Sequence, residues 1–377
     1  MSAEQKRRKL RMREGSALQM GRDRDFIRSR EGMFFCVTGY LHPPDRYTAY
    51  LKYTPASSGK WGDGETAYRR ELPYYHVRTV EQTIRYLEQH YPHYVYDCPV
   101  RNIRFSMVPH EYVAHYYDPQ ERMKEILTAP RDPLEEEVQG LAMALVESAA
   151  VSLDDLGITG STLIGLHNPA FSDIDLLVCG RGNAWRVREA LLEGRSARIR
   201  GLGTEFIEEW SQGIAGRFPL TMGEARYLAS RRWNYGFYGQ RYFSIHPTRT
   251  DAEITERYGD HVYRDAGVAR VRATVVGVGD ALFMPATYRV ADVYIMEGDP
   301  EAAEIREIVS FEGLYRDVVN DGEEVEARGK LERVSNKNAD QNPEDENAGE
   351  YYRLVIGTTM LEGEGYIKPG RLGENSD

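Results

Sequence analysis

Alternating hydrophobic and polar positions dominate the first part of the chain and predict strands. Two aromatic and β-branched runs, "GMFFCVTGY" and "RYTAYLKYTP", flank the turn-forming letters "LHPPD", so we expect a hairpin. The segment "TVEQTIRYLEQHY" instead has apolar residues at helical spacing, with Thr79 as its expected N-cap. These patterns predict a small α+β accessory domain over residues 22–130.

The central region changes to a longer alternation of helices and strands. The segment "DPLEEEVQGLAMALVESAA" predicts a helix that Asp132 caps and that Pro133 begins. Two short strands, "LGITG" and "DIDLLV", follow it, and "QRYFSIHPTR" predicts a further strand after helical segments at 184–194, 204–212 and 221–232. We therefore predict an α/β domain over residues 131–267.

The two ends of the chain have different patterns. From about residue 268, five β-rich runs with polar turns between them are typical of a small barrel, so we predict a β-barrel-like domain over 268–377. The start of the chain, "EQKRRKLRMREG", is strongly basic, and we predict that residues 1–21 are disordered. The expected fold class is multidomain, with α/β and α+β parts.

Composition and charge narrow the setting in which the protein works. A chain of 377 residues is long enough for two or three domains, and its net charge of −11 should repel nucleic acid except where basic residues cluster. Three scattered cysteines without a CxxC pair favour a reducing, cytoplasmic location. The sequence contains no apolar run of about 18 residues, so we predict no membrane partner.

Candidate chemistry lies in the segment "GITGSTLIGLHNPAFSDIDLLVCG". Asp173 and Asp175 are two positions apart, so in a strand their side chains lie on the same face, and the apolar residues between and after them face a core. Two carboxylates this close repel each other and need a compensating cation. Mg²⁺ prefers carboxylate and phosphate oxygens, so the pair indicates a metal site.

Ser161 comes twelve positions before Asp173, and Gly160 precedes it. A glycine allows a phosphate to approach the backbone, and the serine hydroxyl with the amides that follow can donate hydrogen bonds to it. One part of the segment can therefore hold a phosphate chain, and the other part can hold the metal that bridges it. Phosphoryl and nucleotidyl transfer need this combination of positioning and charge neutralisation.

The Gly-Ser pair, the spacer and the Asp-apolar-Asp-apolar run resemble the nucleotidyltransferase superfamily typified by DNA polymerase beta. Elsewhere, "SFEGLY" and "GKLERV" are similar to an archaeal family of predicted nucleotidyltransferases. The resemblance implies a polymerase-beta-like fold for residues 131–267 and an NTP substrate. It also implies that Gly160 and Ser161 bind the nucleotide phosphates, and that Asp173 and Asp175 are catalytic ligands of Mg²⁺ or Mn²⁺.

The sequence departs from the superfamily in its third carboxylate, which usually lies on a later strand and activates the attacking hydroxyl. The strand "RYFSIHPTR" contains no acid. The acids nearest to it in the predicted domain are Asp251, Glu253, Glu205, Glu208 and Glu209, and none matches the pattern. Three hypotheses stay open: the third acid lies elsewhere, His246 replaces it, or the protein binds nucleotide without turning it over.

These observations predict a metal-dependent enzyme that moves a nucleotidyl group from an NTP to an unidentified acceptor. RNA is one candidate acceptor, because small barrels can bind single strands. The alternative is a non-catalytic nucleotide-sensing or RNA-binding protein on the same fold. The basic run "RRW" at 231–233, with Arg226 and Arg241, either neutralises a triphosphate or forms salt bridges on a helix face.

Overall fold

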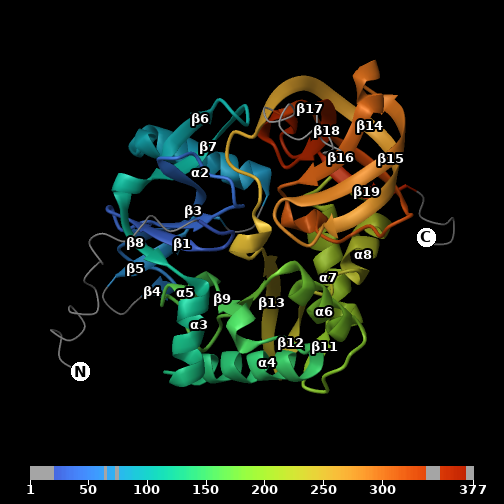
Figure 1. Ribbon diagram of the computed structural model, residues 1–377. Coiled ribbons are helices and arrows are strands. Elements are labelled where there is room, and N and C mark those ends of the chain that lie inside the picture. The colour runs from blue at the N-terminus through green and yellow to red at the C-terminus, as the bar shows by residue number, and fades with distance from the viewer. Residues whose placement is uncertain (1–20, 63–65, 73–75, 337–348, 371–377) are drawn as a thin grey trace.

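The computed structural model describes residues 21–62, 66–72, 76–336 and 349–370. The chain forms a mixed α/β fold with three β-sheets, which appear in Figure 1 as a blue–cyan, a green–yellow and an orange–red part. In the described part of the chain, no helix is long and apolar enough to cross a membrane. The basic segment predicted to be disordered lies outside the described residues, except for Gly21.

The N-terminal sheet contains eight strands with the order β4-β5-β3-β2-β1-β8, and β7 and β6 extend it beside β3. Its strands are β1 (Phe26–Ser29), β2 (Phe34–Val37), β3 (Arg46–Ala56), β4 (Trp61–Gly62), β5 (Ala67–Arg70), β6 (Val95–Cys98), β7 (Ile103–Pro109) and β8 (Val113–Tyr117). The antiparallel pairing of β2 with β3 confirms the predicted hairpin.

Helix α2 (Val77–His90) lies between β5 and β6 in the chain and begins two residues before the predicted N-cap. The cap is His76, whose Nδ1 accepts a hydrogen bond from the backbone N–H of Arg78 at 3.2 Å. The prediction for Thr79 was therefore wrong. Its hydroxyl instead donates to the carbonyl oxygen of His76, because the residue already lies in the first helical turn.

The central sheet has the strand order β11-β12-β13-β10-β9, in which β10 and β13 run parallel. The strands are β9 (Leu156–Ile158), β10 (Ile174–Cys179), β11 (Ile199–Gly201), β12 (Tyr235–Tyr238) and β13 (Arg241–Thr248). Ile174, Leu176 and Val178 pack into a core shared with helices α3 (Pro119–Thr128), α4 (Pro133–Ala149) and α6 (Arg181–Leu192). Asp132 caps α4 as predicted.

The C-terminal sheet closes into a ring, because β14 pairs with both β15 and β17. Its strands are β14 (His261–Asp280), β15 (Ala286–Glu297), β16 (Ile305–Ser310), β17 (Glu324–Asn336), β18 (Glu350–Ile356) and β19 (Tyr366–Pro369). The sequence pattern predicted five strands. It missed the short β19, and it placed the start of the region at residue 268, after β14 has begun.

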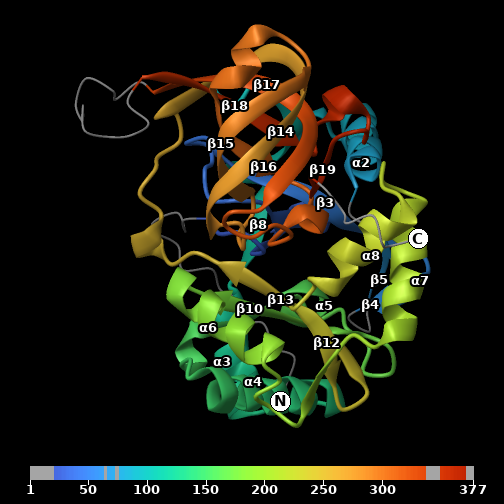
Figure 2. The ribbon, with the colours of Figure 1, turned by 90° about the vertical axis from the view of Figure 1, so that its right-hand side faces the viewer.

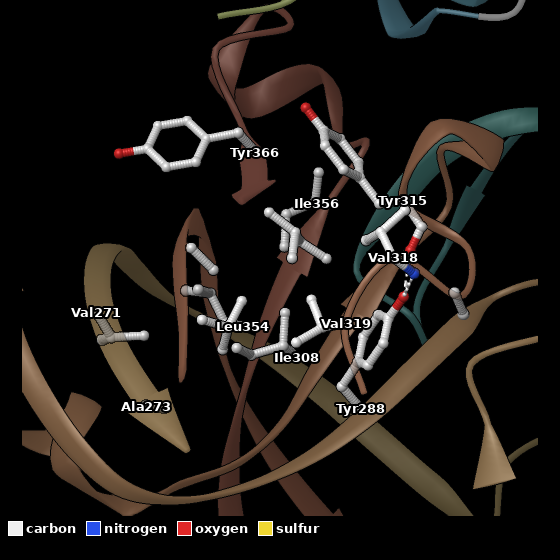
Figure 3. Packing of buried hydrophobic residues seen from close by; sticks show 14 of the residues in the cluster. Val271, Ala273, Tyr288, Ile308, Tyr315, Val318, Val319, Leu354, Ile356 and Tyr366 are labelled. Carbon is white, nitrogen blue, oxygen red and sulfur yellow. Dashed lines mark hydrogen bonds between the residues drawn. The ribbon is translucent and has the colours of Figure 1, made fainter. Parts of the chain in front are cut away.

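Helices α7 (Thr204–Ala215) and α8 (Met222–Ser230) pack beside this ring, as Figure 2 shows. Inside the ring, the hydroxyl of Tyr288 donates to the carbonyl oxygen of Tyr315 at 2.7 Å and accepts from the N–H of Val318 at 3.0 Å (Figure 3). These bonds fix the loop that follows β16. The remaining short helices are α5 (Gly160–Leu163), η1 (Pro92–Tyr94), η2 (His110–Tyr112), η3 (Leu153–Asp155), η4 (Asp251–Glu253), η5 (Pro300–Glu304), η6 (Gly313–Tyr315) and η8 (Thr359–Leu361).

Candidate functional site

A cavity of 1630 Å³ lies between the three sheets and is lined by residues of all three. All four residues that the sequence predicted as a site line this cavity, namely Gly160, Ser161, Asp173 and Asp175. Asp175 lies on β10, but Asp173 comes immediately before the strand, which begins at Ile174. The prediction that both acids lie within the strand was thus wrong by one residue.

The parallel pairing of β10 with β13 places Ser244 opposite Asp175. The hydroxyl of Ser244 donates to Oδ1 of Asp175 at 2.5 Å, and Nε2 of His246 lies 2.8 Å from the same hydroxyl oxygen. His246 Nε2 is also 3.6 Å from Asp175 Oδ1. Asp175 is therefore held by two side chains of the neighbouring strand.

The partners of His246 identify its protonation state. Nη2 of Arg316 lies 3.2 Å from Nδ1, and because arginine only donates, Nδ1 must accept. Nε2 then carries the proton and donates to Ser244. Burial and the nearby positive charge of Arg24 lower the pKa of His246 to about 3, so the ring is neutral at pH 7. Both ring nitrogens are engaged, which argues against the hypothesis that His246 replaces the third acid as the group that activates the attacking hydroxyl.

The pKa values of the two aspartates move apart. The like charge of Asp175, followed by burial, raises the pKa of Asp173 to about 6. Burial alone would also raise the pKa of Asp175, but the nearby His246, the positive charge of Lys52 and the hydrogen bond from the Ser244 hydroxyl hold it below its usual range. Two carboxylates that share a site behave in this way, and a divalent cation between them would offset the repulsion.

The Gly-Ser turn packs directly on Asp175. Gly160 has φ +67, and a Cβ atom there would lie 2.2 Å from Oδ2 of Asp175. The N–H of Thr159 also donates to the carbonyl oxygen of Asp175 at 2.9 Å. Within the described residues, the hydroxyl of Ser161 has no hydrogen-bond partner, so it is available to a ligand in the cavity.

The acids considered for the third position serve other purposes. Asp251 pairs with Arg22, Glu208 pairs with Arg226, and Glu253 accepts hydrogen bonds from the N–H groups of Arg181 and Thr250. Glu205 and Glu209 are exposed on α7. In the part of the chain that the structure describes, no third Asp, Glu, His or Cys joins Asp173 and Asp175 in a set whose ligand atoms all lie within 4.8 Å of one another.

A different set of residues with metal-ligating atoms does occur, and the sequence did not predict it. Ligand atoms of Asp132, Glu135 and His167 lie within 4.8 Å of one another. Their oxygens already have partners, because Asp132 caps α4 and contacts His167 while Glu135 pairs with Arg122. These contacts stabilise the start of α4, which is sufficient to explain the cluster.

Three of the basic residues predicted either to bind phosphate or to form salt bridges form salt bridges. Arg226 pairs with Glu208 at 2.7 Å, Arg231 with Glu323 at 2.7 Å, and Arg241 with Glu137 at 2.6 Å. Arg232 differs, because its guanidinium donates to the carbonyl oxygens of Gly313 and Leu314. Lys52, Arg24 and Arg316 also line the cavity, and no sequence signal marks them because they lie far from the motif in the chain.

The fold and the cavity thus define a mixed α/β protein whose three sheets surround a pair of aspartates. The chain is 32% identical to uncharacterized protein MJ1086 of Methanocaldococcus jannaschii over 355 residues, which covers 92% of this chain and 98% of that protein. It therefore belongs to the same family as this archaeal protein. No family model and no solved structure matched the chain.

Proposed function

We propose that the protein is a metal-dependent nucleotidyltransferase with a polymerase-beta-like central domain, and that it moves a nucleotidyl group from an NTP to an acceptor. The main support is the contact between the candidate phosphate-binding turn and a candidate metal ligand. The turn at Gly160 and Ser161 packs against the carboxylate of Asp175 inside one cavity. A phosphate chain at the turn would therefore lie beside a metal ion at the carboxylates, as nucleotidyl transfer requires.

Each residue has a defined task in this proposal. Asp173 and Asp175 hold Mg²⁺ or Mn²⁺, and the hydroxyl of Ser161 donates to the β and γ phosphates of the NTP. The bound ion supplies neutralisation of the phosphate charge. An acceptor oxygen attacks the α-phosphorus, the bond from that phosphorus to the bridging oxygen breaks, and pyrophosphate leaves. When the acceptor is a hydroxyl group, its proton passes to solvent. Ser244 and His246 orient Asp175 through the hydrogen bonds described above.

The size of the cavity supports a second substrate. Its volume of 1630 Å³ exceeds the roughly 300–1,000 Å³ that is usual for a small-molecule pocket, so a nucleotide would leave part of it unfilled. The N-terminal sheet and the C-terminal ring both contribute to its lining. We infer that these two parts of the chain select the acceptor, for which RNA is one candidate.

One observation favours the alternative, a nucleotide-sensing or RNA-binding protein without transferase activity. The residue opposite Asp175 on the neighbouring strand is Ser244, whose hydroxyl cannot replace a third carboxylate as a general base at neutral pH. Such a protein would still bind an NTP and a divalent ion at the same residues. The two functions therefore differ in turnover and not in ligand.

The experiment is an incubation of the purified full chain with each α-labelled NTP and Mn²⁺. Cell RNA, protein and metabolite fractions serve as acceptors. An Asp173→Ala, Asp175→Ala double variant is assayed in parallel, and Asp251→Ala controls for the loss of an exposed acid that pairs with Arg22.

Label transfer by the wild type and the control, but not by the double variant, would establish the enzyme and its acceptor class. NTP binding that needs both aspartates but gives no transfer would favour the sensor. The absence of both binding and transfer would contradict both proposals.

A further inference from the structure

Three arginines from distant parts of the chain line the same cavity as the aspartates. Arg24 precedes β1, Arg232 follows α8, and Arg316 lies on the loop that follows η6. Arg232 is 7% exposed and Arg316 is 6% exposed. The Tyr288 hydroxyl donates to Tyr315 and accepts from Val318 (Figure 3). These bonds hold the loop that contains Arg316, so this arginine is fixed where it lines the cavity.

Arg316 has more hydrogen-bond donors than partners. Its Nη2 donates to His246, but its buried Nε and Nη1 atoms have no hydrogen-bond partner among the residues that the structure describes. An arginine carries five N–H donors, and burying donors of a charged group without partners is unfavourable. A ligand with several acceptor oxygens would satisfy the donors that the protein leaves unbound.

Arg232 binds carbonyl oxygens and no carboxylate in the described ranges of the chain. It donates to the carbonyl oxygens of Gly313 and Leu314 at 3.0 and 2.9 Å, and within the described part of the chain its buried Nε has no partner. Carbonyl oxygens accept hydrogen bonds but do not neutralise a charge. Among the described residues, neither Arg232 nor Arg316 forms an ion pair with a carboxylate.

The positive charges also act on one another. Burial, followed by the charge of Arg24, lowers the pKa of Arg316 to about 10, so this guanidinium group stays protonated at pH 7. Arg24 lies 3.6 Å from Asp23, whose carboxylate offsets part of this charge. A bound anion would remove the remaining repulsion.

We propose that Arg24, Arg232 and Arg316 form a binding site for a phosphate group. A phosphate offers several acceptor oxygens and a double negative charge, which matches two or three convergent guanidinium groups better than a single carboxylate does. The site adjoins the aspartates, because His246 contacts both Arg316 and the Ser244–Asp175 pair. It requires no metal ion. The triphosphate of a nucleotide and a phosphate on the second substrate are both sources of such a group.

The test is isothermal titration calorimetry of the full chain in EDTA with inorganic phosphate and with pyrophosphate. We expect saturable binding of at least one of the two. Arg316→Gln should weaken it about tenfold or more, because a charged hydrogen-bonding partner is lost. Arg181→Gln is the matched control, since Arg181 lines the same cavity but already pairs with Asp280 at 2.6 Å. Its effect should stay below about twofold.

Two further measurements define the site. Arg316→Lys keeps the positive charge but not the planar set of donors, so it should bind phosphate and pyrophosphate more weakly than the wild type does. This variant tests the site if Arg316→Gln does not fold. Competition with a non-hydrolysable ATP analogue and Mn²⁺ then shows whether the site binds the triphosphate of the nucleotide or a phosphate on the second substrate. Displacement of pyrophosphate assigns the site to the nucleotide, whereas simultaneous binding assigns it to the second substrate.

The failure of this site can be distinguished from the failure of the proposed function. Asp173→Asn should keep or strengthen pyrophosphate binding in EDTA, because it removes a nearby negative charge, while it weakens metal-dependent nucleotide binding. Absence of phosphate and pyrophosphate binding by the wild type would overturn the inference. Equal binding by the wild type and the folded Arg316→Gln variant would overturn it as well.

Discussion

Gly160 lies against the carboxylate of Asp175, so closely that a Cβ atom at position 160 would come within 2.2 Å of Oδ2. The same glycine has φ +67, a conformation that residues with side chains rarely adopt. Position 160 therefore requires glycine for two reasons, the contact with Asp175 and the positive φ. The turn can hold a phosphate beside the aspartates only if this residue has no side chain.

This contact gives the first prediction. Gly160→Ala should displace Asp175, weaken Mn²⁺ and nucleotide binding, and lower the free energy of unfolding by about 1–3 kcal/mol. Gly165→Ala is the control, because Gly165 has φ +71 but nothing within 4 Å of the added Cβ. The Gly165→Ala variant should introduce backbone strain but leave Mn²⁺ binding unchanged. Equal Mn²⁺ affinities of the two variants in calorimetry would disprove the role assigned to Gly160.

The raised pKa of Asp173 predicts how metal binding depends on pH. Its value of about 6 means that a proton competes with the cation below this pH. Affinity for Mn²⁺, measured by electron paramagnetic resonance, should be constant above pH 7 and fall about tenfold per unit well below pH 6. Asp173→Asn should bind Mn²⁺ more weakly and lose this dependence. A wild-type affinity that does not change between pH 5 and pH 7.5 would contradict the prediction.

Arg241 is predicted to hold the segment that precedes Asp173. Its guanidinium donates to the carbonyl oxygens of Pro169 and Ser172, each at 2.9 Å, and pairs with Glu137. Arg241→Gln should lower the free energy of unfolding by about 1–3 kcal/mol, since buried acceptors lose their donors. It should also weaken Mn²⁺ binding.

The matched control for this variant is Arg226→Gln, which breaks an exposed pair with Glu208. It should leave the urea midpoint and Mn²⁺ binding unchanged. If both variants shift the midpoint equally, Arg241 has no special role in placing Asp173.

The buried carboxyl group of Glu312 predicts how the free energy of unfolding depends on pH. Burial raises the pKa of this carboxyl from 4.5 to about 7, although the N–H of Val77 donates to it at 3.3 Å. Between these two values the folded state binds more protons than the unfolded state. The free energy of unfolding should therefore fall as the pH rises through this window. Above pH 7 the buried charge exerts its full destabilising effect.

Glu312→Gln removes the charge and keeps an oxygen that can accept from Val77. It should flatten the decline between pH 4.5 and 7 and raise the free energy of unfolding at pH 8 by about 1–3 kcal/mol. Urea unfolding across this range measures the effect. Glu364→Gln, at an exposed acid that pairs with Arg78, should keep the wild-type profile. A decline of unchanged slope in Glu312→Gln would assign the dependence to other groups.

Local sequence determined much of the fold because its signals act over a few residues. Asp132 and Pro133 predicted the start of α4, and the alternation around Ile174 predicted which side of β10 is buried. The start of α2 was missed because His76 is not a usual N-cap, and β19 was missed because four residues carry too little pattern. Boundaries that depend on a single capping contact are the hardest to predict from pattern.

The sequence by itself predicted that Gly160, Ser161, Asp173 and Asp175 form one site, and all four line one cavity because β9 pairs with β10. Only the tertiary structure decided what surrounds them. Ser244 and His246 meet Asp175 through the parallel pairing of β13, and Arg24 and Arg316 arrive from the other two sheets. Such neighbours depend on how the buried faces of three sheets pack against one another, which no short stretch of sequence encodes.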